Sequence, residues 1–285
     1  MQLLADSGST KTDWFLYDTN ADIYTTPPLG HFESKGMNPV VLATEEIRAI
    51  LTNAFAASLP LEKRAKIQKL CFYGAGCSKI ESGQKMLGIL SEFFETAEIS
   101  VRSDIWAAIH ACCPKTAGIV CILGTGANSC VYNGAEIVDN IPSLGYLLGD
   151  EGAGFDLGKR ILEAYFCRQF PKDLQALFQA QYPDVTETNI LPALYQAPAP
   201  NRYIAGFAQF AIAQQNQPFI QKIIVESFQN FVQYRILPYE SAQKLPVHAI
   251  GSVVWHLSGL WKQVLLQNAL LVGKIIQKPF PIWTA

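Results

Sequence analysis

The sequence predicts an α/β protein made of two lobes of similar construction, with a cleft between them. Two observations predict this fold class. A strand, a glycine turn and a second strand open the chain in residues 2–18, and the same pattern returns in residues 117–134. Further buried strands alternate with helical segments after each opening, which is typical of mostly parallel sheets covered by helices. A change of composition at residues 113–116 sets the predicted lobes at 1–113 and 114–285.

The first lobe is expected to follow the order β-β-β-α-β-α-β-α. Short runs of β-forming residues bounded by turn residues predict its strands, and apolar residues at helical spacing predict its helices. The predicted strands are 2–6, 12–18, 22–27, 67–75 and 97–104, and the predicted helices are 43–57, 83–95 and 105–112.

The second lobe begins with a strand at 117–126. A hairpin of segments 128–134 and 135–142 follows, joined at Asn133-Gly134, a strong turn dipeptide. Residues 157–238 are largely helical and form an insertion, and 245–253 is one more buried strand. A last helix is expected at about 255–271, and it could pack back on the first lobe.

Composition excludes several classes of function. The 285 residues carry a formal net charge of −2, so the protein lacks the strong positive charge that would attract nucleic acid or an anionic membrane. No basic segment followed by an apolar stretch opens the chain, and no apolar run reaches ~18 residues. The seven cysteines contain no C-x-x-C pair, which favours reduced, buried thiols. We therefore expect a cytoplasmic protein.

The first glycine turn, SGSTKT at residues 7–12, has the chemistry of a phosphate site. Gly8 allows exposed backbone N–H groups, Ser9, Thr10 and Thr12 add hydroxyls, and Lys11 adds a charge. A Walker loop would lead into a helix, whereas the aromatic-rich segment that follows here predicts a strand. The turn is therefore a hairpin, either a plain polar one or an anion site. Asp6, at the preceding strand end, is placed to hold Mg²⁺ through water.

Two more glycine turns lie at predicted strand ends. Gly124, Thr125 and Gly126 form the second, followed by Asn128, and Gly251 and Ser252 form the third. Each is a weak signal alone, because glycines are common at strand ends. Three such turns on the strand ends of two lobes favour a nucleotide-binding protein.

Taken together, the motifs resemble the sugar kinase/Hsp70/actin superfamily of ATPases. Within it the chain resembles the BadF/BadG/BcrA/BcrD ATPase-like family, and most of all its N-acetylglucosamine kinase-like members. The motifs are DSGSTKT at 6–12, SD at 103–104, GTGANS at 124–129, GDEGAG at 149–154 and AIGS at 249–252. The resemblance implies two ribonuclease-H-like lobes that bind ATP and Mg²⁺. It also implies that Gly8–Thr12 and Gly124–Asn128 are phosphate loops and that Gly251 and Ser252 lie against the adenosine.

Asp104 is the expected catalytic base. A helix N-cap explains Ser103 and Asp104 equally well from the residues alone. A carboxylate that takes the proton of a sugar hydroxyl is the functional interpretation, and the two are compatible. The resemblance assigns the base to Asp104.

The acids Asp150 and Glu151 follow a glycine-rich segment that includes Gly145. Carboxylates bind sugar hydroxyls well, although an acidic first helical turn is the structural alternative. With the resemblance, we expect Asp150 to bind the sugar, with Glu151 either beside it or bracing the loop. The resemblance also implies that Asn38, which suits a helix N-cap before Pro39 as well, contacts the sugar. Asn128 and Gly145 complete the expected sugar-binding set.

The expected function is ATP-dependent phosphorylation of an amino sugar, with N-acetylglucosamine and its 6-hydroxyl as the leading substrate. The expected partners are the sugar and ATP, with no nucleic acid and no membrane, and a homodimer is allowed. Two alternatives stay open from the residues. One is an ATPase that activates a radical dehydratase, and the other is a sugar sensor without catalysis.

Overall fold

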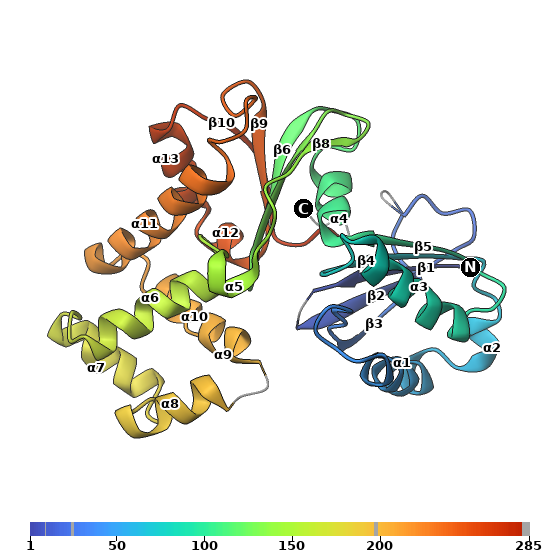
Figure 1. Cartoon of the computed structure of the whole chain (residues 1–285), viewed down its shortest axis with the longest axis horizontal. Helices are drawn as coiled ribbons and strands as arrows, with labels where there is room; N and C mark the ends of the chain where they lie inside the picture. The colour runs from blue at the N-terminus through green and yellow to red at the C-terminus, as the bar shows by residue number, and fades with distance from the viewer. Residues whose placement is uncertain (9, 24–25, 197–198, 281–285) are drawn as a thin grey trace. The chain divides into compact units, whose positions relative to one another are not determined.

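The computed structural model describes residues 1–8, 10–23, 26–196 and 199–280 (Figure 1). The chain divides into two compact units. Unit 1 comprises residues 1–111 together with the segment that begins at Lys278, and unit 2 comprises Cys112–Gln277. These units differ from the predicted lobes at two places. The first unit ends at residue 111, two residues before the predicted boundary. The last described residues, 278–280, belong to unit 1 and not to unit 2.

Unit 1 is built on a five-stranded mixed sheet with the order β3-β2-β1-β4-β5. The strands β1 and β2 are antiparallel, as are β2 and β3, whereas β1, β4 and β5 run parallel. The strands are β1 (Gln2–Ser7), β2 (Lys11–Tyr17), β3 (Gly30–Lys35), β4 (Lys69–Gly74) and β5 (Glu98–Ser103), and the helices are α1 (Thr44–Ser58), α2 (Leu61–Arg64), α3 (Ile80–Phe93) and α4 (Asp104–Cys112).

The predicted third strand at 22–27 is wrong, because the described part of that segment holds no strand. The third strand is β3, which follows the prolines at 27 and 28. Proline lacks the N–H that a ladder needs, so pairing begins only after it.

Both faces of this sheet are buried, which the pattern of β1 shows. Leu3 and Ala5 point into a core shared with α1 and α3, in which Trp14 and Phe55 pack edge to face at 5.2 Å. Leu4 points to the other face and joins a second cluster with Ala107 of α4. A strand buried on both faces reads as a continuous apolar run, as this one does.

Unit 2 repeats the same plan with the order β10-β9-β6-β7-β8. Its first strand again lies in the middle, with an antiparallel pair on one side and parallel strands on the other. The predicted pair of α/β lobes with mixed sheets is thereby confirmed. The strands are β6 (Gly118–Leu123), β7 (Ala127–Tyr132), β8 (Ile137–Asp139), β9 (Pro246–Ile250) and β10 (Leu271–Ile276).

The end of unit 2 differs from the prediction of one helix at 255–271. Two short helices lie there, and a strand that the sequence did not predict, β10, follows them. Ala269 adopts a left-handed backbone with φ of 55°, which stops the helix before the strand. The helices of unit 2 are α5 (Gly145–Leu148), α6 (Gly154–Phe166), α7 (Lys172–Gln181), α8 (Glu187–Tyr195), α9 (Pro200–Gly206), α10 (Ala208–Ala213), α11 (Pro218–Arg235), α12 (Ser252–His256) and α13 (Ser258–Gln267).

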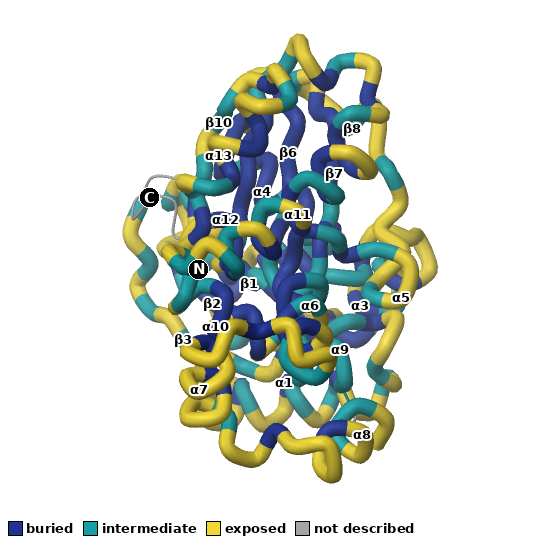
Figure 2. Tube along the Cα trace, turned by 90° about the vertical axis from the view of Figure 1, so that its left-hand side faces the viewer, coloured by how far each residue is buried: buried dark blue, intermediate teal, exposed yellow. Residues whose placement is uncertain are grey.

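The core of unit 2 lies where α6, α10, α11 and α13 cover the sheet. Figure 2 shows β6 as one of the most deeply buried segments. Ile119, Cys121 and Leu123 of β6 belong to this core, together with Phe231 of α11 and Trp261 of α13. None of the helices that the structure describes is both long and apolar enough to cross a bilayer.

The segment after β10 returns to unit 1. Phe280 is 1% exposed and packs with Phe15 and Tyr73, at ring distances of 6.5 and 5.7 Å. Lys278 lies 3.8 Å from Asp13. This short segment thus supplies part of the core on the α4 face of the unit 1 sheet.

We predict that Phe280→Ala destabilises the protein by about 3–5 kcal/mol, because a buried aromatic ring leaves a cavity when it is removed. Denaturant unfolding measures this free energy. Leu29→Ala is the control, since Leu29 is 64% exposed in the same unit, and its loss should cost less than about 0.5 kcal/mol. Equal, small effects of the two substitutions would show that Phe280 does not belong to this core.

Candidate active site

The carboxyl ends of three parallel strands meet at one edge of the unit 1 sheet. Ser7 at the end of β1 pairs with Gly74 at the end of β4, and Gly74 pairs with Ser103 at the end of β5. The segments that leave these strands therefore begin side by side. Ligands of open α/β sheets bind at this kind of edge.

The first glycine turn is a hairpin, as predicted. The N–H of Gly8 donates to the carbonyl of Lys11 at 3.0 Å, and β2 follows at once, which excludes a Walker loop. Gly8 and Thr10 are exposed, whereas Thr12 is fully buried. The Thr12 hydroxyl lies 2.8 Å from Ser7 Oγ, so it holds the base of the turn together. Ser9 lies outside the described residues.

Lys11 is held by acids of its own unit. Its Nζ donates to Glu33 and lies 3.0 Å from Asp13 Oδ1. Burial lowers the pKa of Lys11, but the two carboxylates outweigh burial and raise the pKa overall. Because this ammonium is already paired, the exposed backbone of the turn is the better candidate for holding a phosphate.

Asp6, Asp13 and Asp104 gather their carboxylates near this edge. Burial, and then the charges of Asp13 and Asp104, raise the pKa of Asp6 to about 7. For Asp13, burial raises the pKa, but hydrogen bonds from His31 at 2.9 Å and from Lys11 lower it overall. Asp13 is thus neutralised by protein cations, whereas Asp6 has no hydrogen bond or ion pair to any side chain in the described part of the chain.

The chemistry of this donor set fits a divalent cation. A half-buried carboxylate with two acidic neighbours is stabilised in its charged form by a metal ion. The surroundings of Asp6 are therefore compatible with Mg²⁺, and its role as a metal ligand stays a prediction.

Asp104 is the first residue of α4 and is half-buried. Burial raises the pKa of its carboxyl to about 6, although the backbone N–H groups of Ile105 and of Asp104 itself oppose the shift. The carboxylate thus lies at the start of the helix and interacts with its first N–H groups, so the N-cap and general-base interpretations coexist. Asp104 also contributes to the raised pKa of Cys77, about 12, which is due first to burial.

Asn38 is not the N-cap of the first helix, and this expectation from its place before Pro39 is wrong. The helix α1 begins six residues later, after Ala43. Asn38 Oδ1 instead accepts the N–H of Val40 at 3.0 Å, which makes a local turn. Its amide also packs against the backbone of Gly76, in the loop after β4. The structure therefore brings Asn38 to the same sheet edge as the loop after β4.

The second and third glycine turns touch each other in unit 2. Gly251 has φ of 132°, and a Cβ there would lie 2.2 Å from the carbonyl oxygen of Leu123. Only glycine allows this approach of the two backbones. The second turn is also held from α6, because Gly154 and Phe155 donate to the carbonyls of Gly124 and Thr125 at 2.8 and 3.0 Å. Ser252 follows as the exposed first residue of α12.

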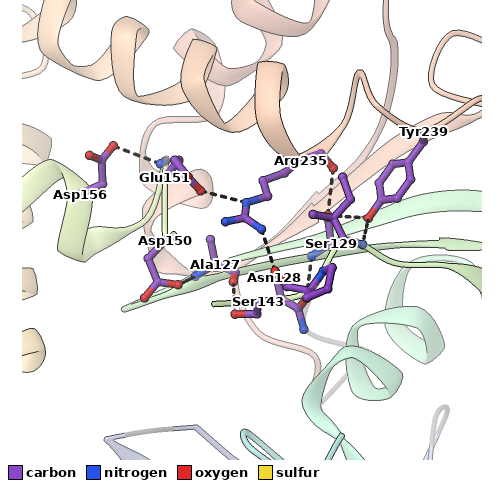
Figure 3. Close-up of polar contacts among 12 residues, drawn as sticks. Ala127, Asn128, Ser129, Ser143, Asp150, Glu151, Asp156, Arg235 and Tyr239 are labelled. Carbon is purple, nitrogen blue, oxygen red and sulfur yellow. Dashed lines mark hydrogen bonds and ion pairs between the residues drawn. The ribbon is translucent and has the colours of Figure 1, made fainter. Parts of the chain in front are cut away.

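Asp150 braces the second turn. Its backbone is left-handed, with φ of 64°, and its Oδ1 accepts the N–H of Ala127 at 2.8 Å (Figure 3). A Cβ on Gly126 would lie 2.8 Å from that oxygen, so the carboxylate lies directly against the turn. Burial raises the pKa of Asp150, and the Ala127 N–H opposes the shift.

Glu151 is a brace of a different kind. Its Oε2 accepts a hydrogen bond from Arg235 Nε at 2.9 Å, an ion pair drawn in Figure 3.

The other two predicted sugar-binding residues of unit 2 are Asn128 and Gly145. The side-chain oxygen of Asn128 accepts the N–H of the next residue, Ser129, at 2.9 Å. Gly145 is exposed at the start of α5, with φ of 69°.

Sequence reasoning missed Arg235 and Asp156. Asp156 accepts the N–H of Gly152 at 3.2 Å, the hydroxyl of Ser227 at 2.6 Å and Nε of Arg160 at 2.9 Å. The Asp156–Arg160 spacing of four residues within a helix was a usable signal. Arg235 lies 84 residues after its partner Glu151 and gives no local signal.

Comparison with solved structures shows the family of the chain. No family model matches the chain, and no curated protein matches it. A candidate N-acetylglucosamine kinase from Porphyromonas gingivalis is 34% identical, with a TM-score of 0.91 over 99% of this chain and 97% of that one.

Two more distant structures share the fold alone. A candidate N-acetylglucosamine kinase from Chromobacterium violaceum is 17% identical, with a TM-score of 0.71 over 98% of this chain and 96% of that one. A ROK family transcriptional regulator, a homologue of the E. coli MLC protein, is 12% identical, with a TM-score of 0.55 over 97% of this chain and 73% of that one.

We predict that Asp6→Asn raises the melting temperature of the metal-free protein by several degrees at pH 8 and leaves it nearly unchanged at pH 4. Folding raises the pKa of Asp6 to about 7, so its contribution to stability is present below pH 4 and is lost as the pH rises to 7. Asparagine cannot ionise, so the variant does not lose this stability as the pH rises. Thermal unfolding in the presence of a chelator measures the melting temperatures, with Asp18→Asn, at an exposed position, as the control. A variant less stable than wild type at pH 8 would contradict the raised pKa.

We predict that Gly251→Ala costs about 3 kcal/mol or more, since the new Cβ meets backbone atoms and the residue has positive φ. Gly259→Ala is the matched control, because no atom lies within 4 Å of its added Cβ, and there alanine should stabilise α13 by ~0.5–1 kcal/mol. Denaturant unfolding compares the two. Similar stabilities would mean that the two turns do not touch.

Proposed function

The chain belongs to the N-acetylglucosamine kinase-like family of the sugar kinase/Hsp70/actin superfamily, and on this premise we propose that it transfers the γ-phosphoryl group of ATP to an amino sugar. N-acetylglucosamine is the proposed substrate and its 6-hydroxyl the proposed acceptor. The 34% identity over almost the whole of both chains supports the kinase class. The distant regulator with the same fold shows why the fold alone does not decide the activity.

Asp104 carries this proposal. A sugar hydroxyl becomes a nucleophile as it loses its proton, and a general base works best when its pKa lies near the working pH. Burial brings the pKa of Asp104 to about 6, so the carboxyl is mostly ionised at neutral pH yet still accepts a proton readily. In the proposed step, Asp104 takes the hydroxyl proton as the sugar oxygen attacks the γ-phosphorus, and ADP leaves.

The glycine turns hold the phosphates in this proposal. The exposed backbone at Thr10 in unit 1 and the N–H groups of Thr125 and Gly126 in unit 2 are the candidates for binding anions. The N–H groups of Gly8 and Gly124 already donate within their own turns, to the carbonyls of Lys11 and Gly126. Positioning and charge stabilisation provide most of the catalysis in phosphoryl transfer. Asp6 would hold Mg²⁺, which neutralises phosphate charge when bound. Lys11, which pairs with Asp13 and Glu33, would change only the electrostatic potential near the phosphates.

Sugar binding is assigned to Asn38 in unit 1 and to Asp150, Gly145 and Asn128 in unit 2. Oδ1 of Asp150 is used by the Ala127 N–H, so Oδ2 is the atom available for a sugar hydroxyl. Glu151 is left out of the sugar contacts, because its carboxylate pairs with Arg235. The loop-bracing alternative is thus favoured for Glu151.

The cysteines do not favour the dehydratase activator. A metal cluster that bridges two chains needs accessible thiolates from each. Five of the seven cysteines are buried, and burial raises the pKa of each of these thiols, Cys77, Cys112, Cys113, Cys121 and Cys130. Cys167 is the only exposed one, so it has no exposed companion.

We predict sugar-stimulated ADP release, greatest with N-acetylglucosamine among a panel of hexoses and amino sugars. In Asp104→Asn, kcat should fall by about 10²–10⁴-fold because the base is lost, while sugar affinity by calorimetry changes little. Asp18→Asn, an exposed acid in the same unit, should keep wild-type activity. No ADP release with any sugar would remove the kinase proposal, and full activity of Asp104→Asn would remove Asp104 as the base.

We also predict that kcat/KM of the wild type falls as the pH drops through about 6, because Asp104 must be ionised to accept a proton. A pH–rate profile with saturating Mg²⁺·ATP measures this. A flat profile from pH 7 down to pH 5 would contradict the raised pKa of the base.

A further inference from the structure

Arg235, the last residue of α11, makes three contacts with one loop. Its side chain is 9% exposed, and Nε binds Glu151 Oε2 at 2.9 Å. Nη1 donates to the carbonyl of Pro142 at 2.8 Å. The third nitrogen, Nη2, lies against Gly149, where an added Cβ would be only 2.5 Å away. One guanidinium therefore holds residues on both sides of α5.

The loop between these contacts has little packing of its own. The helix α5 buries none of its four residues. Leu144, Leu147 and Leu148 are 56%, 79% and 73% exposed. Inside this segment of residues 143–148, Ser143 Oγ donates to the carbonyl of Ala127 at 3.1 Å, and the ring of Tyr146 lies 5.1 Å from that of Phe155. Burial adds little else, so the contacts at the two ends of the segment also help to fix its position. Arg235 supplies contacts at both ends, because the planar guanidinium forms several directed hydrogen bonds at once.

These contacts lead directly to the second glycine turn. Glu151 adjoins Asp150, whose Oδ1 accepts the N–H of Ala127. The carbonyl of Arg235 also accepts the hydroxyl of Ser129 at 2.9 Å. Ser129 lies 2.8 Å from the hydroxyl of Tyr239, which in turn accepts the N–H of Ile141 at 3.0 Å. Figure 3 shows that Arg235 lies between the Asp150–Glu151 segment and β7.

We propose that Arg235 is a positioning residue that fixes Asp150, and through Asp150 the Gly124–Asn128 turn, in their binding geometry. It touches neither substrate and acts through Glu151 and the ends of the α5 loop. Its kinetic consequence rests on the proposed function, because only a kinase uses this turn to bind ATP and Asp150 to bind a sugar. Its structural consequence, an ordered turn, does not depend on the reaction.

Hydrogen–deuterium exchange tests the structural consequence. In Arg235→Met, which keeps the length and loses the charge, we expect exchange in peptides covering residues 124–128 and 142–152 to accelerate at least about 10-fold. Glu151→Gln should cause a smaller acceleration in the same peptides. Peptides from β9 (Pro246–Ile250) should exchange as in wild type. Arg48→Met is the control for the loss of an arginine–glutamate pair as such, because Arg48 pairs with Glu92 at 2.7 Å on the exposed surface of unit 1.

Kinetics test the second consequence. Arg235→Met should lower kcat/KM by about 10- to 100-fold through misplaced binding groups. Arg235→Lys, which keeps the charge next to Glu151, should recover part of this loss, and Arg48→Met should match wild type.

Unchanged exchange at 124–128 in Arg235→Met, or equal acceleration in β9, would overturn the proposal. If Arg235→Met fails to fold, exchange in Glu151→Gln decides: acceleration at residues 124–128 without acceleration in β9 supports the proposal, and no acceleration at 124–128 overturns it. Absence of sugar-stimulated activity in the wild type would remove the kinase proposal alone, since the exchange result stands without it.

Discussion

The crowding of carboxylates at one end of the unit 1 sheet is the constraint on which the proposed chemistry depends. Asp13 is buried, Asp6 and Asp104 are half-buried, and the charges of Asp13 and Asp104 oppose that of Asp6. Asp13 pairs with Lys11 and Lys278 and is hydrogen-bonded to His31, whereas burial raises the pKa of Asp6 to about 7 and that of Asp104 to about 6. Strongly perturbed acids of this kind mark functional sites more often than structural ones. Burial is the main cause of both shifts, and the charges of Asp13 and Asp104 add to the shift of Asp6.

Unit 2 uses its acids in the opposite way. Asp150, Glu151 and Asp156 accept hydrogen bonds from Ala127, Arg235 and Gly152. Their task is to hold a turn whose backbone must stay accessible, and the glycines at 126 and 251 let a carboxylate and a second backbone approach it closely. In the proposed kinase, unit 1 would supply the reactive carboxylates and unit 2 the backbone that binds anions. A kinase needs both.

Much of this architecture could be predicted from the sequence, because strand–turn–strand openings and glycine turns are local patterns. The hairpin at Gly8, the helix start at Asp104 and the repeated plan of the two units are of this kind. Two strands were not predicted. The strand β3 follows two prolines, and only three residues separate β10 from the preceding helix, so neither has a clear periodic signal. The pair of Glu151 with Arg235 and the packing of Asn38 against Gly76 are contacts between distant segments, which no local pattern shows.

The most direct test of the central claim is the pKa of Asp6 and Asp104 themselves. Carboxyl ¹³C NMR of aspartate-labelled protein, with Asp6→Asn and Asp104→Asn to assign the signals, measures both. The account predicts values near 7 and 6 without metal, and a fall of the Asp6 value when Mg²⁺ is added. Ordinary values near 4 for both residues, unchanged by Mg²⁺, would contradict it.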